Sequence, residues 1–224
     1  VQALNATFPD LKISIPSTRV DSFSVDVANA VAKGKRHTLT LAPEAGSQRL
    51  RNAINKLVSE ADLLGAAENA FERGWTGIKM YYMVGLPTEE MDDVAGIVEM
   101  GNKVKAIGRR YMGGKARVRV STSNLVPKAH TPFQWARQDT AEDLERKHQL
   151  LREGCRKSGV EFSWNHPEDS FLEAVLSRGD RRVANGIYEA WRNGARFDAW
   201  TEYFKPQVWQ AAFDKTGINY ERFT

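Results

Sequence analysis

The sequence has one cysteine, Cys155, among its 224 residues. A single thiol excludes a disulfide framework and suits a reducing compartment, so we expect a cytoplasmic protein. Long apolar runs are also missing, since no stretch approaches the roughly 20 residues that a membrane-spanning helix needs. The four histidines have no metal-binding spacing such as HxxxH, so the sequence itself points to no metal-ligating residues.

Neither sign of charge dominates. The chain has 32 Lys and Arg against 28 Asp and Glu, a net charge of +4, and the basic residues are scattered. Nucleic-acid binding therefore stays open but is not supported by charge. The share of apolar residues, 42%, is that of an ordinary soluble globular protein whose length allows one core and a small appendage.

Strands and helices alternate up to about residue 135. Short apolar runs predict four strands, at residues 11–15, 38–42, 77–84 and 116–122. A capping-box pattern at Ser59 and Asp62 predicts the start of one helix, and Thr88 followed by two glutamates predicts another. This alternation predicts βα units on a parallel sheet, and so an α/β fold.

The pattern changes after Trp135. Thr140 and Asp143 open a further helix, and residues 160–164 form a short extended piece. The helix places His148 and Cys155 on an apolar face, where we expect core residues. Residues 169–224 are helical in pattern and carry four aromatic anchors: Trp191, Phe197, Trp200 and Trp209. We therefore expect a first part, residues 1–138, and a helical extension, residues 139–224, that packs on it.

Three loops follow predicted strands: residues 42–49, 85–89 and 125–135. In α/β barrels the C-terminal ends of the strands build the active site, so these loops are candidate binding segments. Each also has a plain structural interpretation. Gly46 serves a left-handed turn beside a solvated Glu44, and Pro87 with Thr88 forms a rigid turn and helix cap.

The order of these loops resembles the later strand ends of radical S-adenosylmethionine (SAM) barrels. Six segments together resemble an uncharacterised radical SAM family whose members carry a cobalamin-binding-like domain upstream: residues 15–22, APEAGSQRLR at 42–51, IKMYYMVGLPTEE at 78–90, PKAHTPFQW at 127–135, LSRGDRRV at 176–183 and GARFDAW at 194–200. The resemblance covers nearly the whole chain. It departs from the GxPGET turn of related enzymes at Thr88 and Glu90. It implies a partial (βα) radical SAM barrel, formed by the later strands, with a helical C-terminal extension.

By this resemblance, polar residues at the strand ends hold the carboxylate and ribose hydroxyls of SAM, and Glu44, Arg19 and Lys79 are the candidates. A cation pairs with the carboxylate, and a carboxylate accepts from a hydroxyl. Leu125 and Val126 would pack against the adenine. Other interpretations stay open: an internal Arg19–Glu44–Lys79 ion network, and an ordinary core role for Leu125 and Val126.

The resemblance further implies a four-iron four-sulfur cluster on three cysteines, and cobalamin is a candidate cofactor of the parent enzyme. A chain with one cysteine cannot ligate such a cluster. We therefore expect a downstream fragment that lacks the N-terminal half of the barrel and is inactive alone. His130, in the third loop, is a candidate to meet a substrate, small or macromolecular, whose identity the sequence does not give.

In a rival interpretation the chain has no catalytic role. The chain would be an interaction module built on a barrel remnant, binding RNA or a partner protein through its Trp-rich tail. CxxxCxxC in a preceding segment would favour the enzyme, and its absence would favour the module.

Overall fold

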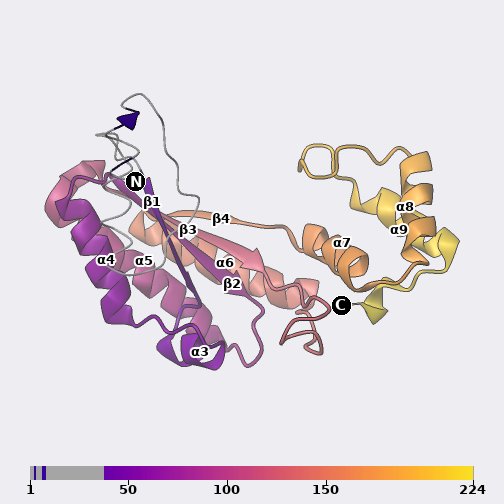
Figure 1. Cartoon of the computed structure of the whole chain (residues 1–224), viewed down its shortest axis with the longest axis horizontal. Coiled ribbons are helices and arrows are strands. Elements are labelled where there is room, and N and C mark those ends of the chain that lie inside the picture. The colour runs from indigo at the N-terminus through magenta and orange to yellow at the C-terminus, as the bar shows by residue number, and fades with distance from the viewer. Residues whose placement is uncertain (1–2, 4–6, 9–37, 224) are drawn as a thin grey trace. The chain divides into compact units, whose positions relative to one another are not determined.

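The computed structural model describes residues 3, 7–8 and 38–223. Its elements follow in this order: β1 Thr38–Glu44, α3 Gln48–Ala53, α4 Glu60–Glu72, β2 Gly77–Val84, α5 Met91–Met112, η1 Gly113–Lys115, β3 Arg117–Asn124, α6 Ala141–Ser158, β4 Glu161–Trp164, α7 Pro167–Arg178, α8 Val183–Arg192, α9 Pro206–Thr216 and η2 Tyr220–Arg222 (Figure 1). The predicted strand at residues 11–15 lies outside the described residues.

The chain divides into two compact units. The sheet unit comprises Val1–Val84, Thr88–Ser123 and Arg146–Trp164, and the helical unit comprises Gly85–Pro87, Asn124–Glu145 and Asn165–Thr224.

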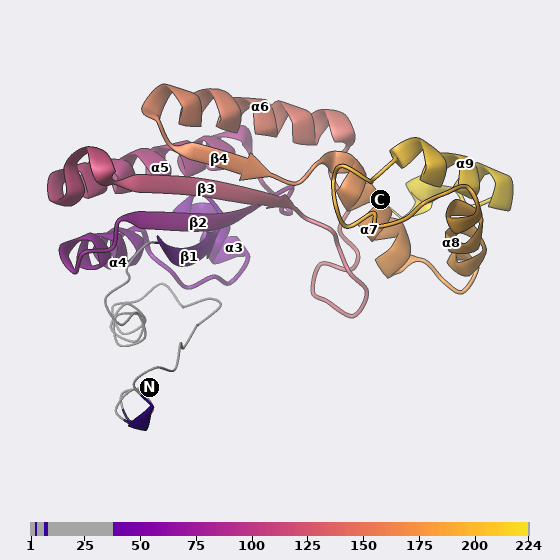
Figure 2. The ribbon, with the colours of Figure 1, turned by 90° about the horizontal axis from the view of Figure 1, so that it is seen from above.

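A four-stranded sheet with the order β1-β2-β3-β4 organises the sheet unit. Strands β1 and β2 pair in parallel, with Leu41 beside Met80, and β3 pairs in parallel with β4, with Val120 beside Phe162. All four arrows point the same way in Figure 2. The prediction of an α/β fold with a parallel sheet is therefore confirmed. The extended piece at residues 160–164 is strand β4, so the sheet unit continues past residue 138.

The strands are buried on one face only. Along β2 the side chains of Ile78, Met80 and Tyr82 are buried, whereas those of Lys79 and Tyr81 on the opposite face are more accessible. The strands follow one another across the sheet in chain order, and right-handed crossovers then place the connecting helices on the same face. Figure 2 views the sheet from its other face, with α4 and α5 behind the strands. We call that other face, among the described residues, the open face.

Local sequence explains where the helices begin. Ser59 and Asp62 form the predicted capping box of α4. Helix α5 begins at Met91, later than the prediction from Thr88, because Thr88 has a φ of 66° and cannot be helical. A second capping box, formed by Glu90 and Asp93, starts α5 instead.

Helix α6 has the predicted apolar face. His148 and Cys155 have exposed fractions of 0% and 1%, which confirms that both are core residues. Burial raises the pKa of the Cys155 thiol to about 11, so this sulfur stays protonated at neutral pH.

The helical unit has its own core. Its buried side chains come from α7, α8, α9 and the turn after α9: Val175, Val183, Ala190, Trp209, Ala212, Phe213 and Ile218. Helix α8 approaches this core closely because Gly186 has no Cβ, which would otherwise lie 2.9 Å from the Phe213 ring. The helical pattern predicted for residues 169–224 is confirmed. Of the four aromatic anchors, however, only Trp209 is buried.

None of the helices in the described part of the chain is long and apolar enough to cross a membrane.

Two leucines of the sheet unit give a matched test of its core. Leu63 on α4 is fully buried, whereas Leu57, in the preceding loop, is 83% exposed. We expect Leu63→Ala to lower the free energy of unfolding by about 2–5 kcal/mol, because it leaves a cavity. Leu57→Ala should change it by less than about 0.5 kcal/mol. Urea titration followed by circular dichroism measures both, and equal effects would contradict the assigned core.

Candidate functional site

A cluster of polar side chains of the sheet unit lies at the carboxyl ends of β1 and β2 and in the segments that follow them. We call this region the carboxyl edge. Helices α3 and α5 begin there, and both loops come from segments that the sequence marked as candidate binding loops. In parallel α/β sheets ligands bind outside the carboxyl ends of the strands, so this edge is the first place to look for a site.

Glu44 is the last residue of β1 and has an unusual backbone. Its φ of 68° lies in the left-handed region, which residues other than glycine rarely adopt. The register between β1 and β2 shifts between Leu41 and Glu44, so the chain leaves the regular ladder here. The Glu44 carboxylate accepts a hydrogen bond from Lys56 Nζ at 3.0 Å and keeps 28% of its side chain exposed. It is therefore held in place and still reachable from solvent.

The turn after Glu44 packs directly against helix α5. A Cβ on Gly46 would lie 2.1 Å from the carbonyl oxygen of Asp93 and 2.7 Å from the Ile97 side chain. A Cβ on Gly96 would in turn lie 3.1 Å from the backbone of Gly46. Two glycines thus permit a backbone-to-backbone contact that no other residue would allow, and this fixes the turn before α3 against the first two turns of α5.

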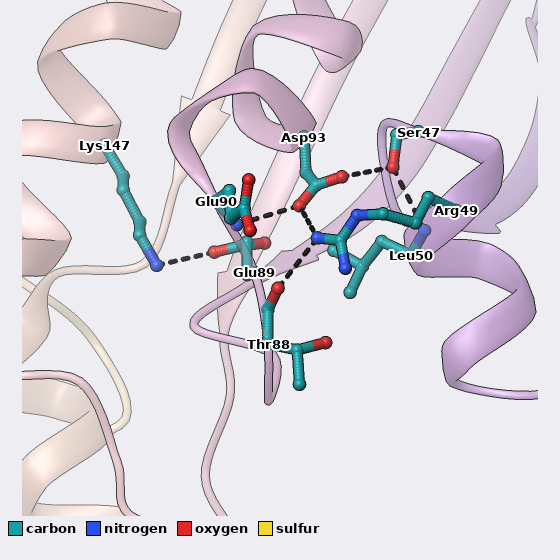
Figure 3. A network of polar contacts seen from close by, with 8 residues as sticks. All are labelled: Ser47, Arg49, Leu50, Thr88, Glu89, Glu90, Asp93 and Lys147. Carbon is teal, nitrogen blue, oxygen red and sulfur yellow. Dashed lines mark hydrogen bonds and ion pairs between the residues drawn. The ribbon is translucent and has the colours of Figure 1, made fainter.

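Asp93 is the centre of a buried polar network (Figure 3). Its carboxylate, 4% exposed, accepts hydrogen bonds from the hydroxyl of Ser47 and the guanidinium of Arg49, and from the backbone amide of Glu90 at 2.8 Å. Arg49 also donates to the carbonyl of Thr88 at 2.7 Å. The loop after β1 and the loop after β2 are therefore joined through one carboxylate.

The charge of Asp93 is maintained by these donors. Burial acts to raise the pKa of the carboxyl, but the hydrogen bonds from Ser47, the Glu90 amide and Arg49 outweigh it, and the pKa is lowered. Asp93 is therefore ionised at neutral pH. Because Arg49 pairs with it, this cation is a structural partner rather than a free ligand-binding group.

The buried side chain of Arg51 stabilises the turn after Glu44. It is 1% exposed, and its guanidinium donates to the carbonyls of Ala45 and Gly46 at 3.0 and 3.1 Å and to that of Val58 at 3.0 Å. Burial lowers its pKa from the ordinary arginine value, but that value is so high that the group stays charged. Most polar residues of the APEAGSQRLR segment therefore hold the turn and the start of α3 in place. Glu44 is its acidic side chain, and it remains partly exposed to solvent.

The loop after β2 is fixed by a second buried ion pair. Glu89 accepts from Lys147 Nζ of α6 at 2.6 Å, and the two side chains are only 2% and 8% exposed (Figure 3). Thr88, just before it, has left-handed backbone. Left-handed backbone is uncommon for a β-branched residue, so this turn holds Thr88 in a strained conformation.

Lys79 lies away from the carboxyl edge. It is the third residue of β2, pairs in register with Thr40, and donates to the hydroxyl of Tyr81 at 2.6 Å. Glu44 is paired with Lys56 instead, so the structure does not form the Glu44–Lys79 part of the internal ion network. Arg19 lies outside the described residues.

The other predicted site residues belong to the helical unit. Leu125 is 8% exposed, and Val126 beside it is half-buried. His130 is exposed, has a φ of 61°, and its backbone amide donates to Gln134 Oε1 at 3.3 Å. As cofactor or substrate contacts these three residues stay predictions.

Sequence reasoning missed the residues that shape the carboxyl edge: Ser47, Arg49, Arg51, Asp93 and Lys147. The position of Ser47 before a helical segment could have indicated a helix cap. No pattern in the sequence indicated that Asp93 pairs with Arg49, 44 residues earlier. Over the described residues, no three His, Cys, Asp or Glu side chains lie together as a metal site would need.

Comparison with known proteins gives one informative match. No family model matches the chain. The chain is similar to an uncharacterized protein of Methanocaldococcus jannaschii, with 31% identity over 172 residues, which is 77% of this chain and 36% of that protein. The chain therefore spans about a third of the length of the relative that it matches.

Gly46→Ala tests the close contact at the carboxyl edge. We expect a loss of about 3 kcal/mol in the free energy of unfolding, because the new methyl group meets backbone that cannot move without displacing α5. Gly65, in the middle of α4, has no atom within 4 Å of where its Cβ would be. Gly65→Ala should therefore stabilise by roughly 0.5–1 kcal/mol. Chemical denaturation measures both, and a neutral Gly46→Ala would contradict the packing.

Asp93→Asn tests the buried carboxylate. Removing the charge should lower the free energy of unfolding at pH 7 by about 1.5–3 kcal/mol, the contribution of hydrogen bonds to a charged group. A lowered folded-state pKa contributes stability above the unfolded pKa and loses it as pH falls through the folded pKa. The wild type should thus lose this increment below about pH 4, and the variant should not.

The neighbouring Asp92 is exposed and provides the control. Asp92→Asn should keep both the stability at pH 7 and the acid-dependent loss. If Asp93→Asn and Asp92→Asn behaved alike in melts from pH 7 to about pH 3, the network would not stabilise the edge.

Proposed function

We propose that this chain forms part of the SAM-binding wall of a radical SAM enzyme, with Glu44 as its ligand contact. The observation that carries the proposal is that, over the described residues, helices cover only one face of the parallel sheet. Parallel sheets are ordinarily covered on both faces, and consecutive strand order with helices on one face is the arrangement of a βα barrel segment, whose other face lines the interior.

The side chains of the open face support an interior role. Strand β3 presents Arg119 and Ser121 there, and β4 presents Glu161 and Ser163 beside them. Arg119 Nε donates to Glu161 at 2.9 Å, and Ser163 donates to Ser121 at 3.1 Å. Such hydrogen-bonded polar side chains suit a face that meets a polar ligand better than one that packs against an apolar partner, because burying polar groups against apolar surface costs free energy.

Glu44 fits a ligand that offers hydroxyl groups. It ends a strand at the carboxyl edge, its carboxylate is partly exposed, and its left-handed backbone is the kind of strain that accumulates at ligand sites. A carboxylate there can accept from two vicinal hydroxyls, as the ribose of SAM would provide.

The ligands of the iron–sulfur cluster are not among the residues of this chain. The described residues include one cysteine, which is buried and protonated, so they do not fit a four-iron four-sulfur cluster. In this proposal the three thiolates come from another segment of a longer protein. When bound there, the cluster would supply the electron that cleaves SAM, and the present residues would bind and orient SAM.

Glu44→Gln in the enzyme assembled with its cysteine-bearing segment is the test. We expect SAM affinity to fall about 10- to 150-fold, the equivalent of one charge-assisted hydrogen bond, with the fold intact. Anaerobic calorimetry measures it. Glu68→Gln, which alters a comparable exposed carboxylate paired with Arg110, is the control and should bind SAM normally.

Two negative results would contradict different parts of the proposal. Unchanged affinity in Glu44→Gln would make Glu44 structural only. If the assembled enzyme neither bound SAM nor released 5′-deoxyadenosine under reducing conditions, the proposed function itself would be wrong.

A further inference from the structure

Helix α8 of the helical unit has a second apolar face that the described structure leaves uncovered. Its inner face, with Val183, Gly186 and Ala190, packs into the core. Its outer face carries Tyr188 and Trp191, which are 61% and 51% exposed. A surface helix ordinarily has polar residues on that side, so this face is built to meet something.

The outer aromatic rings form a stack of planar groups. The rings of Tyr188 and Trp191 lie 5.8 Å apart and are inclined by 23°. The guanidinium of Arg196 lies 4.7 Å from the centroid of the Trp191 ring, and it is held there by donating to the carbonyls of Trp191 and Ala195. The arginine is therefore oriented before any ligand arrives.

The charges around this stack are positive. Residues 180–196 contain four arginines, at positions 181, 182, 192 and 196, and two acids, Asp180 and Glu189, of which Asp180 is paired with Arg182. The Glu189 side chain is only 10% exposed, and it is paired with Lys215 and, at 3.9 Å, with Arg192. Beside the exposed rings of Tyr188 and Trp191, the arginines therefore outnumber the acids.

We propose that the outer face of α8, namely Tyr188, Trp191, Arg192 and Arg196, binds single-stranded nucleic acid. Aromatic rings and arginine planes stack on unpaired bases, and cations beside them neutralise the phosphates. Three more exposed rings, Phe197, Trp200 and Tyr203, follow α8 in the sequence and contact one another. A duplex cannot use it, because its bases are already stacked on one another. This inference does not depend on the proposed enzyme function.

The test measures binding of a labelled oligouridine of about twelve nucleotides to the whole chain by fluorescence anisotropy, at low and physiological salt. Trp191→Ala should weaken binding about tenfold or more, the effect expected for one lost base–aromatic stack. Arg192→Ala should weaken it less and reduce the salt dependence by about one phosphate contact.

Trp135 provides a matched control. It is a tryptophan of the same unit, 89% exposed, and lies away from α8 in the sequence. Trp135→Ala should bind like the wild type. Neither tryptophan belongs to the buried core, so both variants should remain folded and show a cooperative melt.

Three results would overturn the proposal. Equal binding by wild type and Trp191→Ala would place any RNA affinity elsewhere on the chain. Equal affinity for an RNA duplex would indicate charge alone. Displacement of the oligonucleotide by a polyglutamate peptide at matched charge would identify an acidic protein segment as the occupant instead.

Discussion

The buried carboxylate of Asp93 is the interaction on which the carboxyl edge depends. It joins Ser47 of the loop after β1 and Arg49 of α3 to the first turn of α5, and the backbone contact at Gly46 allows it to do so. Removing one donor would leave a buried charge incompletely compensated, which proteins avoid. The network therefore fixes two loops at once, and Glu44 takes its position from that arrangement.

The rigid loops of the carboxyl edge are important for ligand binding because the sheet, over the described residues, is covered on one face only. Covered by helices on a single face, the four strands present Lys79, Arg119 and Glu161 on the other, among the residues that the structure describes. Polar groups on a parallel sheet are useful where the sheet encloses a ligand, and precise loops at its carboxyl end then decide which ligand is bound. The proposed SAM site and the aromatic face of α8 belong to different units, so each can be tested without the other.

Local patterns in the sequence predicted the elements well. The strands at 77–84 and 116–122, the capping box at Ser59 and the buried face with His148 and Cys155 follow from short-range periodicity. The sequence patterns did not predict the contacts between residues far apart in the chain. The pairing of Glu44 with Lys56, the role of Asp93 and the later start of α5 depend on tertiary contacts and on a left-handed Thr88, which propensity does not reveal. The candidate chemistry rests on the motif resemblance and is a proposal about Glu44 and the carboxyl edge.

The most direct measurement is hydrogen exchange of the assembled enzyme, followed by mass spectrometry, with and without SAM. The account predicts that SAM slows exchange at the carboxyl edge, in the peptides that cover residues 43–48 and 88–93, and leaves α4 unchanged. Exchange that stayed the same at both loops while SAM was demonstrably bound would contradict the claim that this edge forms the wall of the SAM site.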